Sequence, residues 1–183
     1  LFDDISNFAR NGLAKILLNN KYGFINKKGV IIIEPNFDAT GNFLDKESIS
    51  VSQDGLWGLI DTSGNFVLEP IYKDAKDVSS TLTVFLSDEG WQYFDGFGKT
   101  INDDSYQDAS TFATNGLARV KQDDLYGYIN MDGETVIKPQ YTQAGHFGLK
   151  TAPVNLNDTW GYVDSKGLFT KDETANPEYT ATN

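Results

Sequence analysis

The chain has 183 residues, of which 39% are hydrophobic and 13% aromatic, and it carries a formal net charge of −11. A chain of this length buries about 70% of its unfolded surface, so it can form one ordinary domain or a short repeat array. The composition is not that of a disordered protein. The negative charge disfavours binding to nucleic acids and to anionic membranes, and it favours cations or basic partners.

Residue types that build many catalytic and metal sites are scarce. The absence of cysteine excludes disulfides and thiolate sites, and the single histidine, His146, excludes a multi-histidine metal site. No apolar run approaches the roughly 18 residues that a membrane-spanning helix needs. The chain starts at Leu1 without methionine, so we expect a processed protein or a piece of a longer one. The compartment stays open, with a secreted or envelope-associated location favoured over a cytoplasmic one.

Three markers recur along the chain in one register, which is typical of a tandem repeat. The aromatic residue of an aromatic–glycine pair returns every 34 or 35 residues, at Tyr22, Trp57, Trp91, Tyr126 and Trp160. A turn glycine keeps the same spacing, at Gly29, Gly64, Gly98, Gly133 and Gly167. A further aromatic residue does so at Phe2, Phe37, Tyr72, Tyr106 and Tyr141.

Each repeat predicts three short strands joined by two turns. Alternating apolar and polar residues predict the first strand at 13–17, 49–52, 82–86, 117–121 and 152–155. A polar turn follows, such as Asp123-Asp124, whose residues tolerate positive φ. The second strand contains the aromatic–glycine pair, with glycines Gly23, Gly58, Gly127 and Gly161. Because glycine weakens a strand, we expect a ring or chain segment of another repeat to pack over it.

The second turn places Asn or Asp first and Gly fourth, as in Asp61-Thr62-Ser63-Gly64. This is the preference of a type I turn that ends in a left-handed glycine. A third strand is expected at 30–34, 66–69 and 135–138, stopped by Pro35, Pro70 or Pro139. The aromatic residue two positions after each proline is then expected to anchor the crossing to the next repeat.

One three-stranded meander cannot bury its apolar face alone, so neighbouring repeats must stack. The sequence therefore predicts an all-β tandem array of about five three-stranded antiparallel meanders over residues 1–170. Residues 171–183 form a C-terminal tail or begin a further repeat. Because propeller blades usually have four strands and about 40 residues or more, we favour an open superhelix over a closed five-bladed propeller.

The pattern resembles the bacterial WG repeat family, whose units carry Trp/Tyr-Gly-x-Ile-Asp/Asn-x-x-Gly and a downstream Pro-x-Tyr. The clearest copy reads WGLIDTSGNFVLEPIY, with Trp57-Gly58, Gly64 and Pro70-Ile71-Tyr72 at the family's positions. The resemblance covers nearly the whole chain, up to about Phe169. It implies a repeat scaffold and brings no catalytic residues with it.

The third repeat departs from this pattern. Its aromatic–glycine pair has become Trp91-Gln92, and Asn102-Asp103-Asp104 stands where the other repeats have proline. Drift in a redundant repeat is the simpler explanation. The alternative is that this repeat bends the array or exposes a partner site, which makes Trp91, Gln92, Asp103 and Asp104 the candidate binding residues.

Acidic pairs such as Asp103-Asp104 and Asp123-Asp124 raise the alternative of a calcium site. The stretch from Asn130 partly matches a calcium loop, but it lacks the full acidic spacing and has Tyr141 at the twelfth position. Turn-forming surface acids are the favoured interpretation, so no cofactor is expected, with calcium as the weaker alternative. His146 has no second histidine and no visible nucleophile motif to work with, so we expect no enzyme.

Two functions remain from the sequence, with a structural spacer as the fallback. The favoured one is a protein-interaction scaffold that binds through an extended acidic surface. The alternative is a carbohydrate or cell-envelope binding module that stacks ligands on exposed rings of Trp57, Trp91 and Trp160. Unpaired strand edges at the ends of an open array also permit end-to-end self-association.

Overall fold

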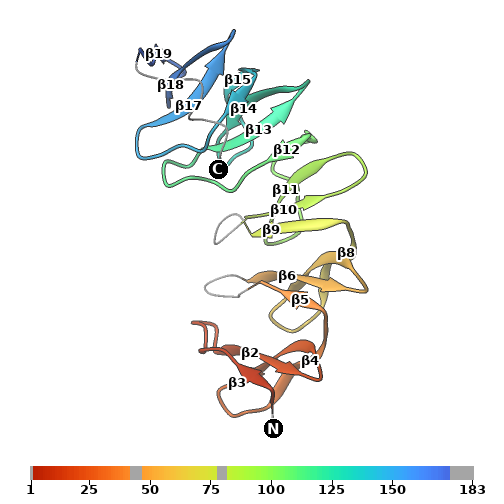
Figure 1. Ribbon diagram of the computed structural model, residues 1–183. Helices are drawn as coiled ribbons and strands as arrows, with labels where there is room; N and C mark the ends of the chain where they lie inside the picture. The colour runs from red at the N-terminus through yellow and green to blue at the C-terminus, as the bar shows by residue number, and fades with distance from the viewer. Residues whose placement is uncertain (1, 42–46, 78–81, 174–183) are drawn as a thin grey trace. The chain divides into compact units, whose positions relative to one another are not determined.

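The computed structural model describes residues 2–41, 47–77 and 82–173. The strands in these ranges form five small antiparallel sheets (Figure 1). The chain divides into two compact units, Leu1–Thr100 with the first three sheets and Ile101–Asn183 with the last two. In the described ranges, no helix is long and apolar enough to cross a membrane.

The first compact unit contains three sheets. The first has the order β1-β2-β3-β4, with bounds Asp4–Ile5, Leu13–Leu18, Lys21–Asn26 and Ile31–Phe37. The second has the order β5-β6-β7-β8, with bounds Ala39–Thr40, Ser48–Gln53, Leu56–Asp61 and Phe66–Tyr72. The third consists of β9, β10 and β11, with bounds Asp74–Asp77, Leu82–Leu86 and Trp91–Asp95.

The second compact unit contains two sheets of four strands. The order β12-β13-β14-β15 has bounds Asp108–Ala109, Ala118–Gln122, Leu125–Ile129 and Thr135–Tyr141. The order β16-β17-β18-β19 has bounds Gln143–Ala144, Thr151–Leu156, Thr159–Asp164 and Phe169–Lys171. Residues 174–183 of the predicted C-terminal segment lie outside the described residues.

The prediction of three strands in each repeat is wrong for four of the five sheets. The segment expected as an irregular crossover contains a further strand, which is only two residues long in β1, β5, β12 and β16. A strand this short has no alternation that a sequence pattern can detect. Four strands in these sheets remove the reason for favouring an open array over a closed propeller, and the open form stays a prediction.

Both predicted turns are confirmed. The polar turn between the first two predicted strands has positive φ at Asn19 and Asn20 (52° and 61°) and again at Asp123 and Asp124 (49° and 65°). The glycine of the second turn is left-handed in every repeat, with φ between 76° and 87° at Gly29, Gly64, Gly98, Gly133 and Gly167. Short polar side chains and glycine adopt this region at low cost, so local sequence determines both turns.

The glycine of the aromatic–glycine pair lies opposite a bulge in its own sheet. Trp57 pairs with Tyr72 and Leu59 with Leu68, so Gly58 alone faces residues 69–71. A Cβ at Gly58 would lie 2.5 Å from the carbonyl oxygen of Leu68. The expectation that another repeat packs over this glycine is therefore wrong, because the backbone of the neighbouring strand occupies that space.

The prolines do not stop the third predicted strand, as the sequence suggested. Pro35, Pro70 and Pro139 lie inside β4, β8 and β15, which continue to Phe37, Tyr72 and Tyr141. Each proline lies in the bulge, where its missing N–H removes no regular ladder bond. The aromatic–glycine pair and the Pro-x-Tyr motif are thus two sides of one backbone contact.

The third sheet lacks this contact. Gln92 stands at the glycine position, where a side chain would meet the approaching strand, and no proline follows. Between Gly98 and Tyr106 the structure has an isolated bridge from Phe94 to Thr100 in place of a bulged strand. The loss of glycine, proline and strand in one repeat is consistent with their shared structural role.

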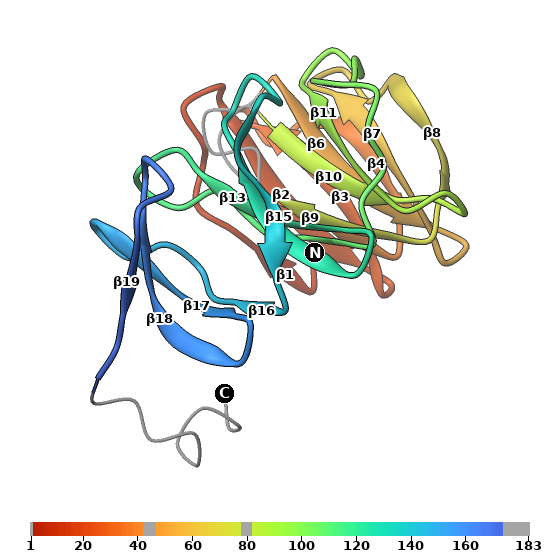
Figure 2. The same cartoon turned by 90° about the horizontal axis from the view of Figure 1, so that it is seen from above.

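The first sheet is apolar on both faces. In β3, Phe24 packs in a cluster with Ile49, Val51 and Ile60 of the second sheet. The adjacent Ile25 packs with Ala14 and Ile16 on the opposite face. Figure 1 shows the sheets of the first unit one above another, and Figure 2, turned by 90°, shows them overlying each other. Adjacent repeats therefore share a core between layers.

The aromatic residue two positions after the proline anchors its sheet to the next one, as predicted. The ring centroid of Tyr72 lies 4.8 Å from that of Phe85 and 5.5 Å from that of Phe94, both in the third sheet. Phe37 and Tyr141 occupy equivalent places in the clusters that join the first sheet to the second and the fourth to the fifth. Aromatic contacts of this kind contribute about 0.5–1.5 kcal/mol beyond burial alone.

Substituting Gly58 by Ala tests the bulge contact. The new methyl group overlaps backbone that cannot move aside, so we expect the free energy of unfolding to fall by about 1–3 kcal/mol. Gly148 is the matched control, because a Cβ there meets its nearest neighbour at an ordinary 3.6 Å. Gly148→Ala should change stability by no more than about 0.5 kcal/mol in urea denaturation. Equal effects of the two substitutions would contradict the assignment.

Candidate functional site

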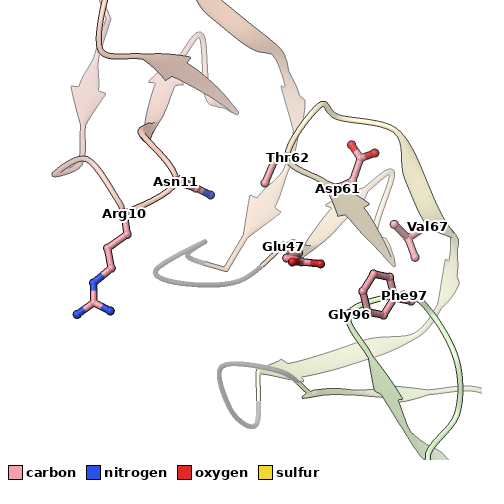
Figure 3. A pocket seen from close by; sticks show the side chains of 8 residues that line it. All are labelled: Arg10, Asn11, Glu47, Asp61, Thr62, Val67, Gly96 and Phe97. Carbon is pink, nitrogen blue, oxygen red and sulfur yellow. The ribbon is translucent and has the colours of Figure 1, made fainter.

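The first compact unit contains a groove of about 860 Å³. It lies where the turns of its three sheets come together, and Figure 3 shows its lining side chains. The loop before β2, the residue before β6, the β7–β8 turn, β8 itself and the turn after β11 all contribute. The lining residues are Arg10, Asn11, Glu47, Asp61, Thr62, Val67, Gly96 and Phe97.

The Asp-x-x-Gly turns build one wall of this groove. The Oδ1 of Asp61 accepts hydrogen bonds from the backbone N–H of Ser63 at 2.8 Å and of Asn65 at 2.9 Å. The Oδ1 of Asp95 accepts the two equivalent hydrogen bonds, from the backbone N–H groups of Phe97 and Lys99, each at 2.9 Å. These bonds hold both turns rigidly, and the second turn presents Phe97 with 77% of its surface exposed.

The groove combines apolar surface with charged groups. The turn that carries Phe97 packs on β8, since a Cβ at Gly98 would lie 3.0 Å from the Val67 side chain. In Figure 3 the Phe97 ring and Val67 lie on one side of Glu47, and Arg10 lies apart on the other side. The lining thus contains two carboxylates, Glu47 and Asp61, and in Figure 3 the carboxylate of Asp61 points away from the Phe97 ring.

The carboxyl group of Asp61 is stabilised in its charged form. Burial alone would raise its pKa, but hydrogen bonds from the Asn65 side chain and from the backbone N–H groups of the turn outweigh burial and lower the pKa. Asp61 is thus anionic throughout the physiological range and offers a fixed negative charge to a ligand.

The candidate residues of the third repeat fall in both compact units. Trp91 and Gln92 belong to the first compact unit, whereas Asp103 and Asp104 belong to the second. Trp91 is 8% exposed, and the Nζ of Lys76 lies 3.9 Å from its ring centroid. This cation–π contact and the surrounding core cover the ring, which corrects the prediction that Trp91 offers a stacking surface.

Asp103 and Asp104 are exposed. Asp104 belongs to a small hydrogen-bond network with Asn102 and Tyr106. The Nδ2 of Asn102 donates hydrogen bonds to the Oη of Tyr106 and to the carbonyl oxygen of Gly133, both at 2.8 Å. The hydroxyl of Tyr106 donates to Asp104 at 3.4 Å. Burial, the largest cause, raises the pKa of Tyr106 to about 12. These contacts hold the segment before β12 in place, so Asp104 has a structural partner.

Aspartates of the acidic pairs form contacts within or next to turns. In the described ranges no three His, Asp or Glu side chains gather closely enough to hold a metal ion. Asp124 pairs with Lys121 at 3.1 Å, and Asp3 accepts the backbone N–H of Asn19 at 2.8 Å. These are the interactions expected of turn-forming acids on a surface.

Phe97 is the groove residue that the sequence analysis missed. The third position of the second turn is polar or charged in the other repeats, where Lys28, Ser63, Asp132 and Lys166 stand. An aromatic residue at a turn position that is polar elsewhere was the available signal. The meeting of three turns around it was not visible, because it depends on how sheets stack.

The fold and the repeated backbone contact define an all-β repeat protein. The model of the WG containing repeat matches residues 1–22, 22–57, 57–80, 105–126 and 126–160. The chain therefore belongs to the WG containing repeat family. The matches leave out the stretch around Trp91 and Gln92, where the third repeat departs from the pattern. No curated protein matches the chain.

Solved structures with little sequence identity share the fold. A structure titled as the eukaryotic initiation factor has a TM-score of 0.53 at 9% identity, over 94% of this chain and 55% of that one. The Hsv2 structure of Kluyveromyces lactis with its complete loop 6CD has a TM-score of 0.50 at 11% identity, over 92% and 61%. These neighbours are WD40 or propeller-like folds. The chain spans about three fifths of the length of the Hsv2 structures it matches.

The pKa of Asp61 provides a test of the groove wall. Since the pKa in the folded state is lowered, Asp61 stabilises the fold above its unfolded pKa of about 3.9. That contribution is lost as the pH falls through the folded pKa. Titration of the side-chain carboxyl carbon by NMR should give a value below 3.8. In the Asn65→Ala variant the value should rise, because one hydrogen bond to the carboxylate is lost. An unchanged value would show that the turn does not hold the charge.

Proposed function

We propose that this chain is a non-enzymatic repeat scaffold that binds protein partners, and that the groove of the first compact unit receives an extended peptide segment. The observation that carries the proposal is Phe97, an aromatic side chain 77% exposed on a rigid turn beside Val67. Exposed aromatic residues on rigid elements are the usual anchors of protein interfaces.

The charges of the groove suggest the chemistry of the partner. The two acids of the lining, Glu47 and the ionised Asp61, outnumber its one base, Arg10, and favour a basic side chain. Phe97 and Val67 favour an apolar side chain. The net charge of −11 adds long-range attraction for a basic segment. The partner is therefore a peptide with Lys or Arg adjacent to an apolar residue.

The directions of the carboxyl pKa shifts support a non-enzymatic role. A carboxyl group that acts as a general acid needs a raised pKa. The shifted aspartate pKa values of the described residues are all lowered, by lysine partners or by turn hydrogen bonds, at Asp38, Asp61, Asp88 and Asp124. His146, the single histidine, lies exposed in a loop.

The exposed aromatic residues favour a protein partner over a carbohydrate. A sugar-binding ladder would repeat one ring position along the array. The exposed aromatic side chains of the described residues instead hold four different repeat positions, at Phe8, Phe66, Phe97 and Tyr162. Trp57 and Trp160 are half-buried and Trp91 is buried, so the carbohydrate alternative has weaker support.

Selection from a random peptide library displayed on phage, run beside a glycan array, tests the proposed function. We expect enriched peptides that combine a basic with an apolar residue and bind more weakly at high salt. Phe97→Ala should weaken binding of a selected synthetic peptide at least tenfold, as for a hot-spot residue. Glu47→Gln should weaken it less and reduce its salt dependence.

Leu149→Ala is the control variant, because this leucine is 88% exposed but belongs to the second compact unit. It should leave binding unchanged. Peptides that bind the Phe97 and Glu47 variants as tightly as the parent chain would exclude the groove. Glycan binding that depends on Trp57 or Trp160 would replace the proposal by the carbohydrate alternative.

A further inference from the structure

The groove of the first compact unit runs across the layers of the stack. Strands of an antiparallel sheet reverse direction one after another, so the loop after the first strand and the turn after the third lie at the same edge. Arg10 lies in that loop of the first sheet, Thr62 in that turn of the second, and Phe97 in that turn of the third. The groove therefore follows one edge from the first sheet to the third.

The chemical character of this edge changes from sheet to sheet. The first sheet contributes Arg10 and, in its second turn, Lys27 and Lys28, all three of them exposed. The second contributes Glu47, and the third contributes the ring of Phe97. Figure 3 shows Arg10 at one end of the groove, Phe97 at the other and Glu47 between them. In a chain with a net charge of −11, the basic end is a local exception that favours an anion.

Asn11 adds hydrogen-bond donors beside Arg10. Its Oδ1 accepts the backbone N–H of Leu13 at 3.1 Å, which orients the side-chain amide. The Nδ2 of the same amide carries two N–H donors, and this exposed side chain lines the groove. A guanidinium group next to amide donors is well suited to hold a carboxylate by charge-assisted hydrogen bonds.

The equivalent loop of the fourth sheet shows which part of this arrangement the fold needs. The Oδ1 of Asn115 accepts the backbone N–H of Leu117, also at 3.1 Å, so the asparagine stabilises the loop in both repeats. Thr114 stands at the position of Arg10. The loop thus forms without the arginine, and the positive charge is a feature of the first repeat that its fold does not require.

We propose that the first-sheet end of the groove binds a carboxylate of the peptide, through the guanidinium of Arg10 and the Nδ2 of Asn11. This inference rests on the proposed function and adds the direction and length of the bound segment. Stacked sheets lie about 10 Å apart, so Arg10 and Phe97, two layers apart, are about 20 Å from each other. At about 3.3 Å per extended residue, the carboxylate lies about six residues from the apolar residue at Phe97. The basic residue lies between them, near Glu47.

A peptide can supply this carboxylate as an Asp or Glu side chain or as its C-terminus. Three synthetic peptides, each with the same apolar and basic residues, distinguish the two sources. The first has an aspartate at the sixth position from the apolar residue and an amidated C-terminus. The second ends there in a free carboxylate and has no aspartate, and the third is amidated and has neither group.

Fluorescence anisotropy of these peptides with the full chain tests the proposal. At least one carboxylate peptide should bind about three- to fivefold more tightly than the third peptide. Arg10→Glu should abolish this difference. Lys166→Glu is the matched control, because it makes the same change of net charge on an exposed turn of the second compact unit and should preserve the difference.

Asn11→Asp tests the amide donors separately. Aspartate keeps an oxygen for the backbone N–H of Leu13 but replaces the donors by a negative charge. It should therefore weaken binding of the carboxylate peptide more than binding of the third peptide. Asn115→Asp makes the same change in the equivalent loop, so it should lower the melting temperature equally and leave peptide binding unchanged.

The outcomes separate this inference from the proposed function. If no carboxylate peptide gains affinity, or if Arg10→Glu and Lys166→Glu act alike, the carboxylate site is wrong. The proposed function then still stands, provided that Phe97→Ala weakens binding of all three peptides. If Phe97→Ala also has no effect, both are wrong.

Discussion

The requirement that a sheet with two apolar faces be covered on both sides governs this structure. Successive residues of one strand, such as Phe24 and Ile25, enter different hydrophobic clusters, so no sheet can bury its apolar surface alone. Stacking satisfies this requirement inside each compact unit. The core that two neighbouring sheets share, and not any single sheet, is therefore the stable element of this fold.

A second constraint holds each layer together. The aromatic–glycine pair and the Pro-x-Tyr motif are separated in the chain, but they meet as Gly58 facing the bulge at 69–71. Glycine leaves room for the backbone, and proline needs no ladder partner there. The bulge adds residues between paired positions and brings Tyr72 opposite Trp57, from where it reaches the next sheet. One backbone contact thus links the fold of a sheet to the stacking of its neighbours.

The proposed function depends on features that differ between the repeats. The lining of the groove includes Phe97, which occupies a turn position that is polar in the other repeats, together with Glu47 and Asp61. The third repeat supplies that turn while it lacks the bulge, since Gln92 replaces the glycine. A repeat that is released from one structural requirement has more freedom to carry a binding residue. The loss of the glycine at Gln92 and the gain of the aromatic side chain at Phe97 therefore occur in the same repeat.

The sequence by itself determined the features that depend on neighbouring residues: the period of 34 or 35, the left-handed glycines, the positive φ at Asn and Asp, the strand alternation and the family resemblance. These follow from local backbone preferences that act within a few residues. The tertiary structure decided the two-residue strands, the reason for Gly58, the burial of Trp91 under Lys76, and the groove around Phe97. Each of these depends on which backbones and layers come into contact, and residues far apart in the chain meet there without leaving a periodic signal.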